Sequence, residues 1–214
     1  MIKKIKATLF EKLILVFLIL LGTFALSFTI FLKNKCLFVK NFDPQKIKFD
    51  KPEDIAVLNT DCGNVIIELY PEISPNAVIR FKKLVNLSAY DDVAFHRVIK
   101  DKLVQGGDIE FGKKNQLDYG KIGTGNSGLG TIKSEIDAEF NFIKGSVGLA
   151  RSLKYDTEDS QFFIILDDEP LFEGEYTPIG KVIYGIKILE KVKYSHKTEY
   201  VLRPDFINSI RMYK

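Results

Sequence analysis

The stretch Phe95–Asp108 reads FHRVIKDKLVQGGD. Its first residues, Phe95–Ile99, have the apolar and β-branched character of a short strand, and that strand carries an arginine, Arg97. A charge on a buried or half-buried strand costs free energy unless it is paired or has a chemical role. Gln105 follows eight residues later and precedes two glycines. The stretch therefore predicts that the Arg97 guanidinium is either paired or functional.

Other segments place polar residues or glycines in an equally distinctive way. Ser160–Leu166 (SQFFIIL) sets Gln161 beside two phenylalanines. Three further motifs are GTGNSG at residues 123–128, GSVGLARS at 145–152 and YTPIGKVIYG at 176–185. With the opening stretch, and in this order over residues 54–213, they resemble the signature of the cyclophilins, a family of peptidyl-prolyl cis-trans isomerases.

Short apolar runs bounded by turn residues predict a mainly β domain. Strands are expected at residues 56–58, 65–69, 95–99, 146–150, 162–166, 178–184 and 206–212. Two helices are expected: one from Ser74, as its cap, and Pro75 to near Ser88, and one over Ile186–Val192. This pattern favours a closed antiparallel barrel. The resemblance implies the same fold class, a closed eight-stranded antiparallel β-barrel capped by two α-helices.

The motif Gly123–Gly128 formally fits the dinucleotide pattern G-x-G-x-x-G. That pattern binds phosphate only where a strand leads in and a helix follows. No apolar strand precedes this motif and no helical pattern follows it, so it predicts a glycine-rich loop. The two histidines offer no convincing metal or Ser/His/Asp arrangement. We expect no cofactor and no metal.

An apolar segment near the N-terminus predicts a membrane helix. Leu13–Leu32 is a run of 20 residues without a charge, long enough to cross a bilayer. We divide the chain into a cytoplasmic N-terminus (1–12), a transmembrane anchor or uncleaved signal (13–32), a tether (33–53) and the cyclophilin-like domain (54–214). Four lysines precede the run, which favours an N-terminus inside the cell and an exported domain.

A cleaved signal peptide is the alternative interpretation. Thr23–Ala25 offers a small-residue cleavage site, but the apolar run continues beyond it to Leu32. We expect a single-pass protein of the cytoplasmic membrane with its domain on the extracytoplasmic, periplasmic side of a bacterium; secretion after cleavage is the second outcome.

The charge balance differs between the two ends of the chain. Residues 1–40 carry seven lysines and one glutamate, a net charge of +6, whereas the remainder carries 24 basic and 27 acidic residues, a net charge of −3. A nucleic-acid-binding domain would show a basic face. We expect no nucleic-acid partner.

The sequence holds only two cysteines, Cys36 after the apolar run and Cys62 in the first predicted hairpin. An exported protein could pair them. Two unrelated free thiols are the prediction.

The resemblance implies the site residues. The catalytic arginine of the family corresponds to Arg97, and its partner glutamine corresponds to Gln105. The substrate-binding positions correspond to Lys102, Leu103, Ala150, Arg151, Gln161, Phe163, Leu171, Phe172 and Tyr176. From the residues alone, Arg97 could instead form a stabilising pair with an acid such as Asp108. His96, which alternates with Arg97, is predicted to be structural.

The proline pocket departs from the family pattern at several positions. Lys102 replaces the usual phenylalanine, Leu171 a tryptophan, and Tyr176 a histidine, while Phe172 stands where leucine is frequent. Loss of an aromatic wall could remove on the order of 1–3 kcal/mol of ring burial. A lysine stem can still cover apolar surface.

These observations predict a peptidyl-prolyl isomerase that acts, as a monomer, on proline-containing segments of exported polypeptides. The alternative is a module of the same fold with low activity that binds proline-containing segments or scaffolds an envelope assembly. Lys102 is the residue that favours the alternative.

Overall fold

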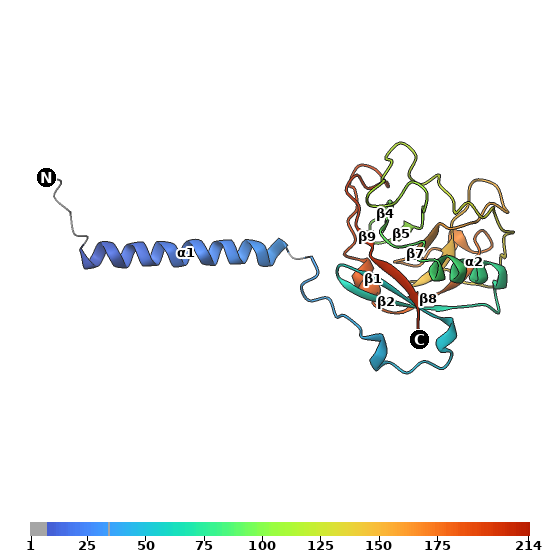
Figure 1. Ribbon diagram of the computed structural model, residues 1–214, viewed down its shortest axis with the longest axis horizontal. Coiled ribbons are helices and arrows are strands. Elements are labelled where there is room, and N and C mark those ends of the chain that lie inside the picture. Colours follow the sequence, from blue (N-terminus) through green and yellow to red (C-terminus); the bar gives the residue numbers. More distant parts are fainter. Residues whose placement is uncertain (1–7, 34) are drawn as a thin grey trace. The chain divides into compact units, whose positions relative to one another are not determined.

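The protein is described by a computed structural model that covers residues 8–33 and 35–214. The described chain divides into two compact units, one ending at Phe38 and one formed by Val39–Lys214. The helix α1 (Leu9–Lys33) belongs to the first unit, and all strands belong to the second (Figure 1).

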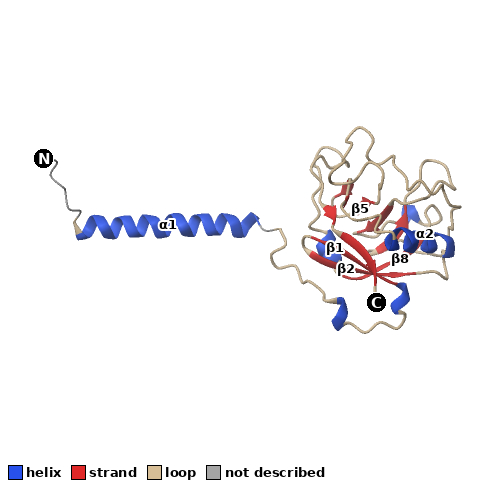
Figure 2. Cartoon of the chain, viewed as in Figure 1, coloured by secondary structure: helices blue, strands red, loops and turns tan. Residues whose placement is uncertain are grey.

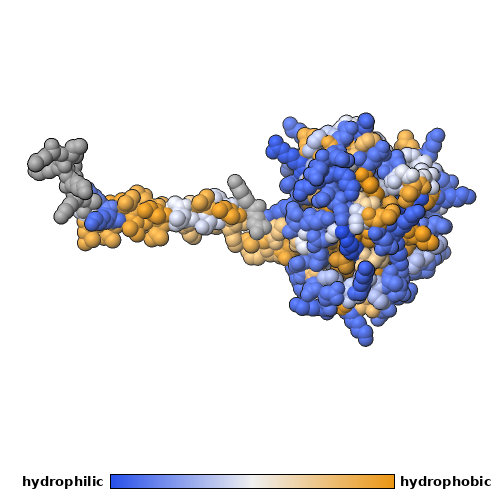
Figure 3. Space-filling model, viewed as in Figure 1, coloured by the Kyte–Doolittle hydropathy of each residue, from blue (hydrophilic) through white to orange (hydrophobic). Residues whose placement is uncertain are grey.

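The helix α1 begins with a reciprocal cap. Thr8 N–H donates to the Glu11 carboxylate at 2.7 Å, and Glu11 N–H donates to the Thr8 hydroxyl at 3.3 Å. Leu9–Phe31 is long enough to cross a membrane, and an 18-residue stretch within it has a mean hydropathy of 2.7. Its surface is mostly hydrophobic (Figure 3). A helix of this length and composition fits a membrane span and also the apolar part of a signal peptide.

The second unit is built on one antiparallel sheet of eight strands (Figure 2). The sheet order is β10-β1-β2-β8-β6-β7-β5-β4. Its strands are β1 (Ile55–Thr60), β2 (Gly63–Leu69), β4 (Arg97–Ile99), β5 (Leu103–Gly106), β6 (Ser146–Leu149), β7 (Phe162–Ile165), β8 (Pro178–Tyr184) and β10 (Ser209–Met212). A separate two-stranded sheet joins β3 (Val93–Ala94) to β9 (Phe206–Ile207). The predicted mainly β class is confirmed.

The prediction of a closed barrel is wrong, because β10 and β4 are edges that do not pair with each other. The outer edge of β4 is already used. Val98 N–H donates to the Glu199 carbonyl at 2.8 Å, and Val201 N–H donates to the His96 carbonyl at 2.9 Å. The expected strand over 206–212 splits at Asn208, so that β9 pairs with β3 and β10 with β1. The sheet is an open half-barrel.

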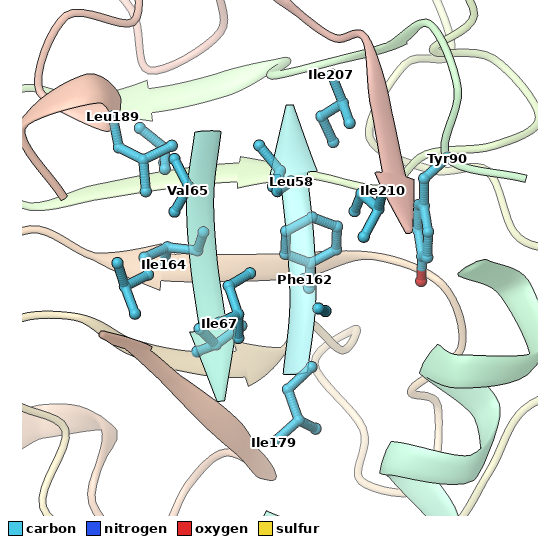
Figure 4. Packing of buried hydrophobic residues seen from close by; sticks show 14 of the residues in the cluster. Leu58, Val65, Ile67, Tyr90, Phe162, Ile164, Ile179, Leu189, Ile207 and Ile210 are labelled. Atoms are coloured by element: carbon cyan, nitrogen blue, oxygen red, sulfur yellow. The ribbon is translucent and has the colours of Figure 1, made fainter. Parts of the chain in front are cut away.

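The concave side of this sheet holds the main core (Figure 4). The helix α2 (Pro75–Asn86) contributes Phe81, whose ring meets those of Tyr90 and Phe162 at 5.3 and 5.6 Å. The second predicted helix is shorter than expected, because α3 spans only Ile186–Leu189.

The start of α2 is capped differently from our expectation. The Ser74 side chain makes no capping hydrogen bond. The Glu135 carboxylate, 58 and 59 residues away along the chain, accepts the N–H groups of Ala77 and Asn76 at 2.8 and 3.1 Å. A carboxylate at a helix N-terminus also interacts favourably with the helix dipole.

Much of the segment expected to be a tether packs on the domain. Two short 3₁₀ turns, η1 (Pro44–Lys46) and η2 (Pro52–Asp54), lie within it. The Phe42 ring lies 5.0 Å from that of Tyr184, and the Phe49 ring lies 4.9 Å from that of Tyr213.

Both cysteines, Cys36 and Cys62, are disulfide-bonded, and no described cysteine is a free thiol. The prediction of two free thiols is therefore wrong.

Candidate active site

Three neighbouring strands bring the predicted polar residues to one face of the sheet. In the antiparallel pair β4–β5, Arg97 stands opposite Gln105, and in the pair β5–β7 Gln105 stands opposite Phe163. Residues directly opposite each other in a sheet project to the same side. Arg97, Gln105 and Phe163 therefore form a row across the half-barrel.

A chain of hydrogen bonds runs from this row into the glycine-rich loop. Arg97 Nη1 donates to Gln105 Oε1 at 3.1 Å, and Gln105 Nε2 donates to Gln161 Oε1 at 3.1 Å. Gln161 Nε2 donates in turn to the carbonyls of Gly123 and Gly125, at 3.1 and 2.9 Å. The glycine-rich loop Gly123–Gly128 thus orients Gln161, a predicted site residue.

The guanidinium of Arg97 has a partner that the sequence did not reveal. Its Nε and Nη2 both lie 2.7 Å from Oε2 of Glu199. The expected pairing with an acid is therefore found, but the acid is Glu199 and not Asp108. Asp108 is fully buried and accepts the backbone N–H groups of Phe111, Gly123 and Gly125 instead.

An aromatic cluster lies beside the polar row. Phe163 is buried, and its ring lies 5.2 Å from those of Phe172 and Tyr176, which are 4.6 Å from each other. Leu103 and Ala150 belong to the same cluster. Five of the predicted substrate-binding residues are therefore brought together, and Phe172 and Tyr176 remain partly exposed.

Two residues behind the cluster were missed as site residues. Phe142 is buried with its ring 5.8 Å from Phe163 and 6.1 Å from Phe172. Gly148 leaves room for the Phe163 ring, since a Cβ there would lie 2.5 Å from Phe163 Cζ. In the sequence, Gly148 within the GSVGLARS motif was the signal that could have indicated this close packing.

Two other predicted site residues lie at the surface. The Lys102 side chain is 60% exposed, and its amine pairs with the Glu169 carboxylate at 3.2 Å. Leu171 is 81% exposed, on the 3₁₀ turn η3 (Pro170–Phe172). Neither belongs to the aromatic cluster.

Arg151 supports the cluster from its rim. Its guanidinium lies over the rings of Tyr155 and Tyr176, 4.2 and 5.0 Å from their centroids. Its Nη2 also donates to the Glu175 carboxylate at 2.9 Å. Because its side chain is only 9% exposed, Arg151 fixes the Tyr176 ring rather than offering a free charge.

A cavity of about 410 Å³ continues the site beyond Gln105 and Gln161. Its other walls include residues 123–126 of the glycine-rich loop and residues 150–152. The loop is anchored below by Ser127, whose hydroxyl donates to the Asp159 carboxylate at 2.6 Å. The cavity therefore lies on the side of the glutamine pair that faces the glycine-rich loop.

Comparison with known proteins agrees with this geometry. The family profile "Cyclophilin type peptidyl-prolyl cis-trans isomerase/CLD" matches residues 55–212. A probable peptidyl-prolyl cis-trans isomerase of Brucella suis is 40% identical over 159 residues, which cover 73% of this chain and 81% of that protein. A peptidyl-prolyl cis-trans isomerase of Helicobacter pylori is 34% identical, with coverages of 75% and 96%.

Among solved structures, a cyclophilin-type isomerase of Cryptosporidium parvum, crystallised in the presence of the dipeptide Ala-Pro, matches with a TM-score of 0.65 and 26% identity. The match covers 75% of this chain and 99% of that one. The chain belongs to the cyclophilin-type peptidyl-prolyl cis-trans isomerases. Its reaction is the cis-trans rotation of peptide bonds that precede proline.

His96 is buried, as its predicted structural role requires, and neither ring nitrogen has a hydrogen-bond partner among the described residues. Burial lowers its pKa from 6.5 to about 4, opposed in part by the charge of Asp108. The folded protein therefore keeps this imidazole neutral where the unfolded chain binds a proton.

This difference predicts a loss of stability in acid. As the pH falls from 6.5 to about 4, His96 binds a proton in the unfolded chain but stays neutral in the folded protein. The free energy of unfolding should therefore fall by about 3 kcal/mol over this range. Urea denaturation across this range measures the loss. His96→Phe should flatten this part of the profile, whereas His196→Gln, at an exposed histidine, should retain it. An unchanged profile in His96→Phe would contradict the assignment.

Proposed function

We propose that the aromatic cluster binds the substrate's proline ring while Arg97 stabilises the twisted peptide bond. The observation that carries this proposal is the row of Arg97, Gln105 and Phe163 on adjacent strands. It sets a cationic donor and an apolar surface on the same face of the sheet, with Gln105 between them. The relative from Cryptosporidium parvum, crystallised in the presence of Ala-Pro, supports a proline-containing peptide as the ligand.

The chemistry requires no nucleophile. Conjugation gives the X-Pro bond a rotation barrier of about 20 kcal/mol. When the bond twists, the conjugation is lost and the proline nitrogen regains a lone pair. A fixed N–H donor near that nitrogen interacts more strongly with the twisted state than with either planar state, which lowers the barrier.

Arg97 has donors available for this task. A guanidinium carries five N–H groups. Among the described contacts, Nε and one N–H of Nη2 face Glu199, and one N–H of Nη1 faces Gln105. One N–H on each terminal nitrogen is left for the substrate. Since the side chain is 28% exposed, a bound peptide would also shield it from water.

Arg97→Ala should therefore lower kcat/KM by about 100-fold or more, the scale of losing a preorganised donor. The full chain in detergent micelles is assayed by NMR exchange spectroscopy on an Ala-Pro-Phe peptide. Arg211→Ala, which removes another arginine from an ion pair with Asp91, is the matched control and should retain activity. An Arg97→Ala variant as active as wild type would refute the assignment.

Lys102 leaves the hairpin side of the pocket without an aromatic wall. Lys102→Phe should raise kcat/KM roughly three- to tenfold, because a ring beside Leu103 adds apolar contact to the bound proline. Lys102→Ala is the control, since it breaks the ion pair with Glu169 without adding a ring. If both variants gained kcat/KM equally, the gain would come from loss of the lysine charge and not from the added ring.

A binding module is the second function that this residue favours. In that case the folded wild type binds the peptide without measurable turnover, and Lys102→Phe restores catalysis. Titration of the protein with the Ala-Pro-Phe peptide, followed by NMR exchange spectroscopy, separates the two functions. Peptide binding and isomerisation are read from the same spectra.

We propose further that the enzyme acts on exported proteins from an anchored position outside the cytoplasm. The apolar helix α1, the lysines that precede it and the disulfide-bonded state of both cysteines support this proposal. Disulfides persist in oxidising compartments and are rare in the cytosol.

An alkaline phosphatase fusion to the C-terminus tests the topology in a bacterial host. The phosphatase should be active when fused to the full chain and inactive when residues 9–33 are deleted. Mass spectrometry of the membrane fraction should find the helix still attached. An inactive full-length fusion would contradict export, and a shortened chain in the soluble fraction would favour secretion after cleavage.

A further inference from the structure

We propose that Glu199 is a positioning residue for catalysis, which holds the guanidinium of Arg97 in the orientation that the twisted peptide bond requires. This inference rests on the proposed role of Arg97. Glu199 lies outside every motif that identified the site, 102 positions beyond Arg97 in the sequence.

The contact geometry favours this role. A single carboxylate oxygen, Oε2, lies 2.7 Å from both Nε and Nη2 of Arg97. Charge-assisted contacts along one edge of a guanidinium fix the plane of that group. Gln105 holds the opposite terminal nitrogen at 3.1 Å. Together the two partners restrict both the tilt and the rotation of the group, and Gln105 alone would leave it free to turn about one hydrogen bond.

The segment that carries Glu199 is itself fixed to the site. Its backbone pairs with the chain around Arg97, through Val98 N–H to the Glu199 carbonyl and through Val201 N–H to the His96 carbonyl, which brings Tyr200 opposite Arg97. The Thr198 hydroxyl donates to the Tyr200 carbonyl at 2.8 Å. Glu199 is therefore presented from a strand-like segment beside Arg97 rather than from a free loop.

Tyr200 ties the same segment to the glycine-rich loop. Its ring stacks on His96 with 6.4 Å between centroids. A Cβ added at Gly123 would lie 3.0 Å from Tyr200 Cε1, so the ring leaves no room for a side chain there. Gly123 also accepts the Gln161 amide. The segment thus contacts both ends of the hydrogen-bond chain, Arg97 through Glu199 and Gly123 through Tyr200.

The expected effect is moderate and specific to turnover. Glu199 is 53% exposed, and pairs of this kind are weak in water. Glu199→Ala should lower kcat about fivefold and change KM less than twofold, because it disorders a group that acts mainly in the transition state. Glu199→Gln keeps an oxygen acceptor for Arg97 and should recover at least half of the lost kcat.

The experiment measures kcat and KM of the full chain in micelles by NMR exchange on the Ala-Pro-Phe peptide. Glu190→Ala is the matched control, because Glu190 also forms a 2.7 Å ion pair, with Lys144, and contacts none of the site residues through a described hydrogen bond. It should retain wild-type kcat. The Nε–H signal of Arg97 provides a direct readout and should shift and exchange faster with water in Glu199→Ala.

A double-mutant cycle separates this inference from the proposed role of Arg97. In the Arg97→Ala background, Glu199→Ala should have no further effect on kcat. If Arg97→Ala abolishes activity while Glu199→Ala retains wild-type kcat or raises it, the positioning role fails and the catalytic arginine stands. If Arg97→Ala is fully active, the catalytic assignment fails, and the positioning role fails with it.

Discussion

The site depends on how one arginine is held at the edge of a sheet. A guanidinium that is neither in water nor fully paired costs free energy, and here Gln105 and Glu199 satisfy part of Arg97 from two sides. The register of three strands then decides what lies beside it, since β5 stands between β4 and β7. A shift of one residue in either pairing would turn Gln105 or Phe163 to the other face of the sheet and separate the donor from the apolar pocket.

The open edge of the half-barrel has a consequence for the site. Had β4 paired with β10, its outer backbone groups would have been used by a regular strand. Residues 199–201 occupy that edge instead, and an edge so covered is also protected from pairing with another chain. Because the sheet is open, Glu199 and Tyr200 lie beside β4, where a closed barrel would have a regular strand.

The sequence predicted what depends on local pattern and on motif spacing. The β1–β2 hairpin, the strand that carries Arg97, α2 and the cluster of Phe163 with Tyr176 follow from periodicity, turn residues and the family resemblance, whereas β5 was not predicted. It could not predict polar contacts between distant loops. Glu135 caps α2 and Glu199 pairs with Arg97, but both stand in irregular segments where a glutamate is ordinarily a solvated surface residue. The closed barrel failed for a related reason, because local patterns predict strands but not which edges pair, and residues 199–201 lie beside β4 in place of β10.

The pocket shows how such a site can change at one wall and keep its apolar character. The hairpin position that usually supplies a ring holds Lys102, whose amine is drawn to Glu169 at the surface. On the opposite side, Phe172 stands where the family often has leucine, and it packs against both Phe163 and Tyr176. The aromatic surface of this cluster therefore includes Phe172 of η3 and no residue of the β4–β5 turn other than the aliphatic Leu103. Arg151 lies over the Tyr176 ring and Phe142 packs against Phe172, while the exposed Lys102 adds no ring from the hairpin side.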